Sequence, residues 1–122
     1  MASPVRVLVI DDDPGIRQML SLALGEAGYV VAVSDGQQLE GPGGADVVLL
    51  DVRLGNQTAR QLLDDVPALM RVPIIVMTAT IAADVAAREL PGIAAVVRKP
   101  FDLDVVERTI RDVLAAAPPR RG

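Results

Sequence analysis

The strongest constraint on the fold is the alternation of short aliphatic runs with segments of helical periodicity. The runs are rich in Val, Ile and Leu, which is typical of strands buried on both faces of a parallel sheet. Helices are expected to begin near Asp13, Thr58, Thr80 and Asp102, where apolar residues recur at helical spacing. The aliphatic runs span residues 5–10, 29–33, 46–50, 73–77 and 94–97.

Local signals mark where some of these helices begin and end. Asp13 is a suitable N-cap, and Pro14 suits the first turn of a helix. Thr58 and Gln61 have the spacing of a capping box, in which each residue bonds to the backbone of the other. Pro67 should end or kink the helix that begins at Thr58, because proline lacks a backbone N–H.

The connection between the second and third aliphatic runs is irregular. Residues 36–45 contain four Gly and one Pro, which leaves room for one or two helical turns at best. The alternation still predicts an α/β fold with right-handed crossovers and helices on both faces of the sheet. The leading topology is a flavodoxin-like, doubly wound (βα)5 sandwich with a parallel five-stranded sheet of order 2-1-3-4-5.

The composition indicates one acidic domain. We expect the domain to span residues 1–117 of the 122, with residues 118–122 forming a disordered tail or the start of a linker. A net charge of −4 disfavours direct nucleic-acid binding by this chain. The absence of Cys and His excludes disulfides and imidazole bases. Neither a secretory signal nor a membrane-length apolar run is present, so the cytoplasm is the expected location.

Polar side chains follow four of the aliphatic runs at the point where each run ends. Asp11 and Asp12 follow the first run, and Asp51 follows the third. Thr78 and Lys99 follow the fourth and fifth. In a sheet of order 2-1-3-4-5 these four strands are neighbours, and ligands bind beyond their carboxyl ends. The sequence therefore predicts that these side chains converge on one cleft.

This set of residues suits a particular chemistry. Three carboxylates held close together repel one another, so one must take a proton or a cation must neutralise them. Oxygen ligands favour a hard ion such as Mg²⁺, which uses one or two carboxylates and keeps several waters. Lys99 offers a positive charge and Thr78 a hydroxyl donor. A metal, a nucleophilic carboxylate, a cation and a hydroxyl donor are the parts that phosphoryl transfer requires.

Four segments resemble the receiver domains of two-component response regulators, in the manner of the chemotaxis regulators. They are VLVIDDDPGIRQML, DVVLLDVRL, PIIVMTA and RKPF, and the likeness extends over residues 5–116. The resemblance implies that Asp51 is the phosphoacceptor. It also implies that Asp12, Asp51 and the backbone carbonyl of Arg53 bind Mg²⁺ directly, while Asp11 acts through a metal-bound water.

The same resemblance implies roles for the remaining site residues and for partners. Thr78 and Lys99 would grip the phosphoryl oxygens, and the Lys99–Pro100 peptide bond would be cis. A sensor histidine kinase or a phosphotransfer protein would donate the phosphoryl group, and a downstream effector would read the result. Such a domain is not an ordinary enzyme, because it catalyses only its own phosphoryl transfer and dephosphorylation.

Three positions depart from the family pattern. Gly55 stands where a proline is usual, and Ala59 stands where a glycine is usual, so the loop over residues 54–57 should have its own conformation. Val96 replaces the aromatic residue that moves during switching in the family. Valine is small and stiff at χ1, so it has no large ring to bury or expose.

Two other functions are compatible with parts of the sequence. A haloacid-dehalogenase-type phosphatase would use Asp11 as nucleophile and Asp13 as a second carboxylate, although the N-cap role explains Asp13 more simply. A pseudo-receiver would be an interaction module that never takes phosphate. Retention of all the site residues favours a phosphorylated receiver over both.

Overall fold

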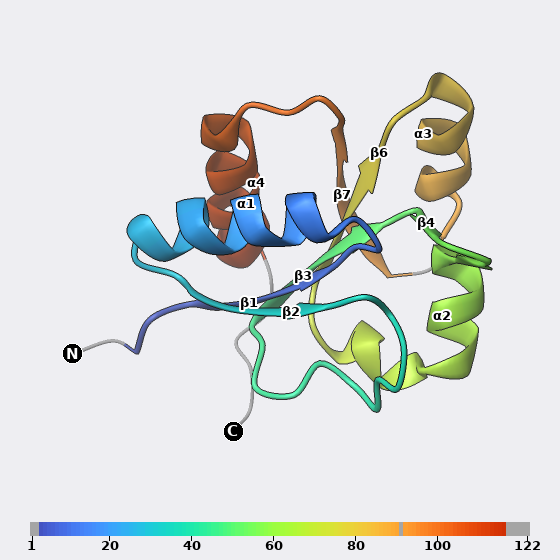
Figure 1. Ribbon diagram of the computed structural model, residues 1–122, viewed down its shortest axis with the longest axis horizontal. Coiled ribbons are helices and arrows are strands. Elements are labelled where there is room, and N and C mark those ends of the chain that lie inside the picture. The colour runs from blue at the N-terminus through green and yellow to red at the C-terminus, as the bar shows by residue number, and fades with distance from the viewer. Residues whose placement is uncertain (1–2, 91, 117–122) are drawn as a thin grey trace.

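A parallel five-stranded sheet forms the centre of the molecule in the computed structural model, which describes residues 3–90 and 92–116 (Figure 1). Its strand order is β2-β1-β3-β6-β7, which is the predicted order 2-1-3-4-5 of the five long strands. The predicted strands are all present, within a residue or two of their expected bounds. They are β1 (Arg6–Ile10), β2 (Val30–Ser34), β3 (Val47–Asp51), β6 (Ile74–Thr78) and β7 (Ile93–Arg98).

Helices cover both faces of this sheet. Helices α1 (Pro14–Glu26) and α4 (Leu103–Ala116) lie on one face (Figure 1). Helices α2 (Ala59–Asp65) and α3 (Ile81–Arg88) lie on the other face, with a 3-10 helix, η1 (Pro67–Arg71), after α2. The predicted doubly wound α/β architecture is therefore confirmed.

The core consists of two aliphatic clusters, one on each face of the sheet. Along β3, Val47 and Leu49 pack toward α1 and α4, whereas Val48 and Leu50 pack toward α2 and α3. All four side chains are fully buried. Strand β3 is thus apolar on both faces, because successive side chains of a strand point to opposite sides.

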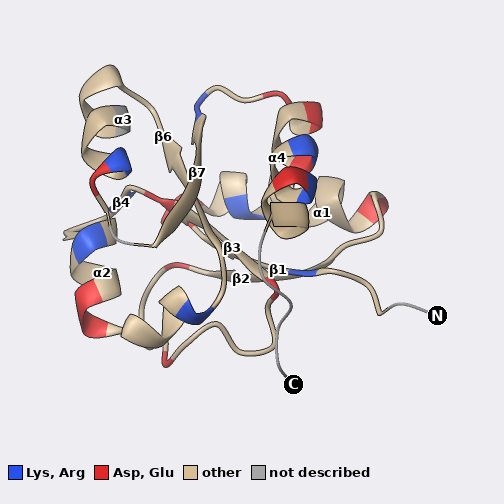
Figure 2. Ribbon diagram, turned by 180° about the vertical axis from the view of Figure 1, so that it is seen from behind, with Lys and Arg blue, Asp and Glu red and all other residues tan. Residues whose placement is uncertain are grey.

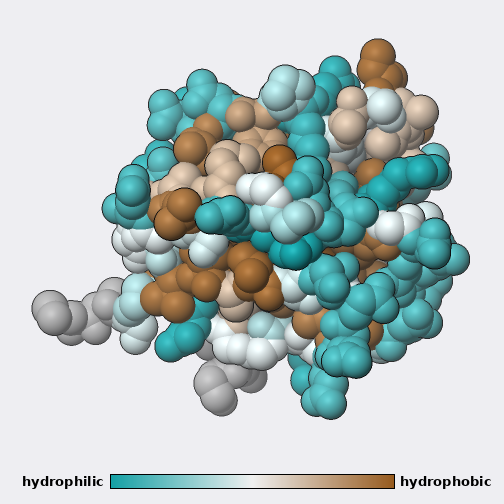
Figure 3. All heavy atoms as spheres, viewed as in Figure 1, coloured by the Kyte–Doolittle hydropathy of each residue, from teal (hydrophilic) through white to brown (hydrophobic). Residues whose placement is uncertain are grey.

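The connection between β2 and β3 contains no helix, although one or two turns were allowed by the sequence. Residues 35–46, all of them described, form bends and turns. Gly36 and Gly43 have φ values of +93° and +61°, which interrupt any regular helix. Val30 of β2 lies on the face that such a helix would cover, and it is 40% exposed. Hydrophobic residues are accordingly visible at the surface over β2, below α1 (Figure 3). A cavity of about 240 Å³ lies between this connection and the β1 and β2 strands.

A small antiparallel hairpin that the sequence did not predict links β3 to α2. It consists of β4 (Arg53–Leu54) and β5 (Gln57–Thr58). Leu54 anchors it, because this side chain is only 2% exposed and packs in the core. The hairpin includes residues 54–57, the loop in which the sequence departs from the family pattern.

The predicted helix caps are present. The Asp13 side chain accepts a 2.8 Å hydrogen bond from the Gly15 amide at the start of α1. The capping box of α2 is complete, since the backbone N–H of Gln61 donates to Thr58 Oγ1 and the backbone N–H of Thr58 donates to Gln61 Oε1. Pro67 follows the end of α2, as expected.

Two further expectations concern the backbone and the chain end. The Lys99–Pro100 bond is cis, as the resemblance implied. The predicted domain boundary at residue 117 and the tail that follows lie outside the described residues. In the described part of the chain, every helix is too short or too polar to cross a bilayer.

Two leucines of α1 test the packing of the α1–α4 face. Leu24 is fully buried, so Leu24→Ala should lower the free energy of unfolding by about 2–5 kcal/mol. Leu22 is 62% exposed on the same helix, so Leu22→Ala should change stability by about 0.5 kcal/mol or less. Urea unfolding followed by circular dichroism measures both. Equal losses in the two variants would show that α1 does not pack as described.

Candidate functional site

Three carboxylates meet beyond the carboxyl ends of the two central strands. Asp11 and Asp12 directly follow β1, and Asp51 is the last residue of β3. One carboxylate oxygen from each of the three lies within 4.8 Å of the others. In Figure 2 acidic residues lie at the end of β3 beside β4, and basic residues lie at the end of β7. The predicted convergence of the three aspartates is therefore present in the structure.

Asp11 is the most enclosed member of this cluster. Its side chain is fully buried, and its Oδ2 lies 3.0 Å from Lys99 Nζ. Its Oδ1 accepts a 2.9 Å hydrogen bond from the Asp13 amide. Both oxygens of this buried carboxylate are therefore satisfied, as a buried charge requires.

Asp51 lies beside the same lysine but is less enclosed. Its Oδ2 is 3.6 Å from Lys99 Nζ, and its side chain is 13% exposed. The pKa of Asp51 is raised from 3.8 to about 6, chiefly by burial of its carboxyl group and next by the negative charge of Asp11. Lys99 and the Arg53 amide oppose this rise in the pKa.

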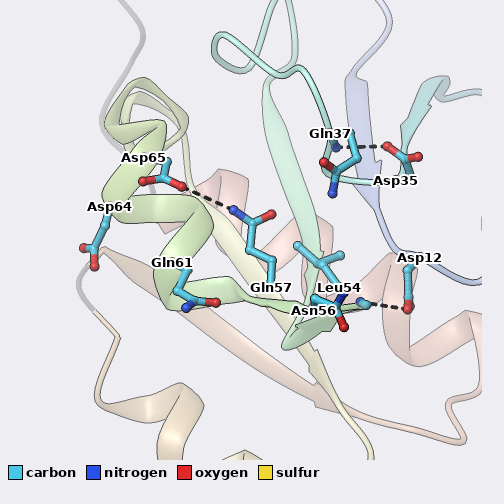
Figure 4. A pocket seen from close by; sticks show the side chains of 10 residues that line it. Asp12, Asp35, Gln37, Leu54, Asn56, Gln57, Gln61, Asp64 and Asp65 are labelled. Atoms are coloured by element: carbon cyan, nitrogen blue, oxygen red, sulfur yellow. Dashed lines mark hydrogen bonds between the residues drawn. The ribbon is translucent and has the colours of Figure 1, made fainter.

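Asp12 faces the solvent side of the cluster. The residue is exposed, and its Oδ2 accepts a 2.9 Å hydrogen bond from the amide of Gly55 at the tip of the β4–β5 hairpin. Figure 4 shows this bond at one wall of an open groove of about 700 Å³. The groove is lined by carboxylates and side-chain amides from the 35–37 segment, the hairpin and α2.

Thr78 and Lys99 complete the predicted set. Thr78 ends β6 and is fully buried, deeper than a residue at an open cleft would be. Its Oγ1 is buried without a hydrogen-bond partner among the described residues. Lys99 follows β7 and has a side chain that is 20% exposed, between Asp11 and Asp51. An unpaired buried hydroxyl is costly, so a ligand oxygen near Thr78 would relieve that cost.

The structure places two other predicted residues away from the centre of the cluster. The Arg53 amide donates to Asp51 Oδ1 at 3.4 Å, and its side chain is exposed. A role for the Arg53 carbonyl in metal binding stays a prediction. Asp13 caps α1 and lies outside the carboxylate cluster, which removes the second carboxylate that a haloacid-dehalogenase-type reaction would need.

Two contacts of the site were not predicted from the sequence. Arg17 on α1 donates from Nη1 to the backbone carbonyl of Asp11 at 2.7 Å. Gly55 donates its amide to Asp12, a residue 43 positions earlier. Arg17 has the weak signal of a basic residue two turns after the aspartates, whereas a backbone amide carries no signal in residue type.

The donor set fits a hard divalent cation. Three carboxylates offer oxygen ligands close together, and oxygen is what Mg²⁺ prefers in proteins. The raised pKa of Asp51 is partly due to the negative charge of Asp11 and Asp12, which a bound cation would neutralise. A single lysine shared by two carboxylates leaves the cluster with excess negative charge.

A parallel sheet with carboxylates, a lysine and a buried hydroxyl at one end is the arrangement that the sequence motifs predicted for a signalling receiver domain. The family model for the response regulator receiver domain matches residues 7–111, and the chain belongs to this family. This match confirms the resemblance that the sequence motifs indicated.

Curated relatives agree with this family. The chain is 30% identical to the transcriptional regulatory protein GlrR of Escherichia coli K12, over 95% of this chain and 28% of GlrR. It is 32% identical to the probable transcriptional regulatory protein TcrX of Mycobacterium tuberculosis, over 91% of this chain and 50% of TcrX. The chain therefore spans half or less of the length of these relatives.

Solved structures agree as well. A response regulator from Chloroflexus aurantiacus superposes with a TM-score of 0.80 at 29% identity, covering 93% of this chain and 99% of that one. The non-phosphorylated HemR receiver domain of Leptospira biflexa superposes with a TM-score of 0.77 at 25% identity, covering 98% and 100%. Both are similar to this chain over nearly its full length.

The raised pKa of Asp51 predicts how stability depends on pH without metal. Between pH 3.8 and about 6 the folded state binds this proton more tightly than the unfolded state does. Asp51 therefore makes the fold less stable as pH rises through this range. In EDTA at pH 7.5, Asp51→Asn should be more stable than wild type by about 1–3 kcal/mol. The gain should disappear near pH 4.

Urea unfolding at several pH values measures this difference. Asp112→Asn is a matched control, because Asp112 is exposed on α4 and outside the cluster. That control should show no pH-dependent gain. A gain for Asp51→Asn that stays constant from pH 4 to 7.5 would contradict the raised pKa.

Proposed function

We propose that this receiver domain accepts a phosphoryl group on the carboxylate of Asp51 and that Mg²⁺ is required for the transfer. The observation that carries the proposal is the position of Asp51 at the end of the central strand. It lies 3.6 Å from Lys99 and within the cluster formed with Asp11 and Asp12. Asp51 is also partly accessible, which a reaction with another protein requires.

The chain's own residues supply most of the chemistry. A carboxylate oxygen of Asp51 forms a bond to phosphorus, and the bond from phosphorus to the donor atom breaks in line with it. Asp12 and Asp51, with Asp11 behind them, would hold Mg²⁺, which supplies positive charge for the phosphoryl oxygens. Lys99, whose Nζ lies 3.6 Å from Asp51 Oδ2, would add a second positive charge.

Thr78 links phosphorylation to a change of shape. Its hydroxyl has no protein partner among the described residues, so a phosphoryl oxygen on Asp51 would provide its first acceptor. Movement toward that oxygen would pull on residues 79–81 and on α3. Val96 is half-buried against the core on the sheet face covered by α2 and α3, and it offers no aromatic ring to move. The readout should therefore pass mainly through α3 rather than through β7.

Partners follow from the same proposal. A sensor histidine kinase or a phosphotransfer protein would donate the phosphoryl group, and an effector domain or protein would receive the signal. The chain is also 31% identical to the sensor histidine kinase RcsC of Escherichia coli K12, over 85% of this chain but only 12% of RcsC. The domain would not turn over a separate substrate, although it would catalyse the loss of its own phosphoryl group. The cytoplasm remains the expected location.

Phosphorylation is tested by intact-mass spectrometry after incubation with Mg²⁺ and acetyl phosphate. Wild type should gain the mass of one phosphoryl group, and EDTA should prevent the gain. Asp51→Asn should abolish the gain, because the acceptor oxygen is replaced. Asp112→Asn should behave as wild type. Full modification of the Asp51→Asn variant at another residue would refute the assignment, and a wild type that never gains mass would favour a pseudo-receiver.

The switch is tested by amide hydrogen exchange with and without beryllofluoride, a phosphoryl mimic. In wild type, exchange in residues 79–90 should change strongly, and exchange in residues 94–97 should change little. Thr78→Ala should still accept phosphate but should lose most of the change in residues 79–90. Thr109→Ala is the matched control, since Thr109 lies on α4, outside the 79–90 segment. A response confined to β7 and α4 would contradict the route through α3.

A further inference from the structure

The tip of the β4–β5 hairpin contacts the carboxylate cluster through the backbone. The Gly55 amide donates to Asp12 Oδ2 at 2.9 Å, and the Arg53 amide of the same hairpin donates to Asp51 Oδ1 at 3.4 Å. Two of the three clustered carboxylates therefore accept hydrogen bonds from one short hairpin. A hairpin placed only to connect β3 with α2 would not need either bond.

The conformation of the tip restricts which residue can make this contact. Gly55 has a φ of +66°, in the left-handed region that favours glycine. The space around its Cα is open, with no heavy atom within 4 Å of an added Cβ. A residue here needs an N–H group and tolerance of positive φ. Proline provides neither, whereas asparagine provides both.

The hairpin is held firmly enough to position a donor. Leu54 is buried beside Gly55, and its Cδ1 lies against Gly36. On the other strand, Gln57 Nε2 lies 3.4 Å from Asp65 Oδ2 of α2 (Figure 4). The hairpin then enters α2 through the Thr58 capping box. The hairpin that carries the Gly55 amide is thus anchored to the core through Leu54 and to α2 through Gln57 and Thr58.

We propose that Gly55 is a positioning residue for the metal site and that its amide orients Asp12 for the cation. This inference rests on the proposed Mg²⁺-dependent function. An ionised carboxylate has two oxygens and several lone pairs, so a hydrogen bond to Oδ2 would leave other lone pairs of Asp12 available to a cation. Hydrogen bonds that orient metal ligands commonly change metal affinity by about 10–100-fold when they are removed.

The coupling runs in both directions. If the amide of Gly55 strengthens metal binding, metal binding must strengthen the bond between the hairpin and Asp12 by the same free energy. Metal occupancy would then stabilise the hairpin wall of the 700 Å³ groove, and the groove's shape would respond to the metal before any phosphoryl group arrives.

The test uses ¹H–¹⁵N spectra of the full chain, free of metal and then titrated with Mg²⁺ alone. Solvent exchange of the Gly55 amide should slow as Mg²⁺ binds. The Mg²⁺ dissociation constant should rise about tenfold or more in Gly55→Pro. Gly55→Asn, which keeps the amide and the backbone conformation, should retain most of the affinity.

A second proline variant separates the lost donor from a disturbed turn. Asn56→Pro alters the same exposed tip but keeps the Gly55 amide, so it should weaken Mg²⁺ binding less than Gly55→Pro. Equal weakening in the two variants would overturn the proposal, as would faster exchange of the Gly55 amide when Mg²⁺ binds. If resonances of Asp11, Asp12 and Asp51 do not respond to Mg²⁺ in wild type, the metal site itself is wrong, which is a distinct result.

Discussion

The ion pair between Lys99 and Asp11 is the interaction on which the site depends. Asp11 is fully buried, so its negative charge needs a partner, and Lys99 Nζ lies 3.0 Å away. These residues follow the first and last strands in the sequence, and the pair therefore joins β1 to β7 across the ends of β3 and β6. Removing one partner of a buried pair leaves an uncompensated charge, which typically costs about 3–5 kcal/mol. Asp51 lies beside this pair, with its Oδ2 3.6 Å from Lys99 Nζ.

The arrangement of strands could be predicted because their sequences are distinctive. The run over residues 47–50 is apolar at every position, and that pattern occurs where both faces of a strand are buried. The helix missing from residues 35–46 was only partly foreseen, since glycines weaken a helix without deciding what replaces it. The β4–β5 hairpin has only two residues in each strand, too few for any periodic pattern to show.

The same distinction applies to the site. The convergence of Asp11, Asp12, Asp51 and Lys99 could be predicted, because each has a chemically specific side chain at the end of a predicted strand. Strand order then determined which of them would meet. The Gly55 bond uses a backbone N–H, which every residue type but proline has, and the Arg17 bond ends on a backbone carbonyl, which every residue type has. Their partners depend on loop conformation, which the sequence did not predict. The burial of the Thr78 hydroxyl likewise depends on packing from both sides of β6.

Burial and charge repulsion make the carboxylate cluster an unfavourable part of the fold. Burial and neighbouring charge raise the pKa of Asp51 to about 6, so near neutral pH its ionised form is less stable here than in water. The large aliphatic core on both faces of β3 provides the stability that offsets this cost. A carboxylate destabilised in this way gains from a cation that neutralises its negative charge. The attraction of the cluster for a cation and the cost of burying an ionised Asp51 therefore have the same physical cause.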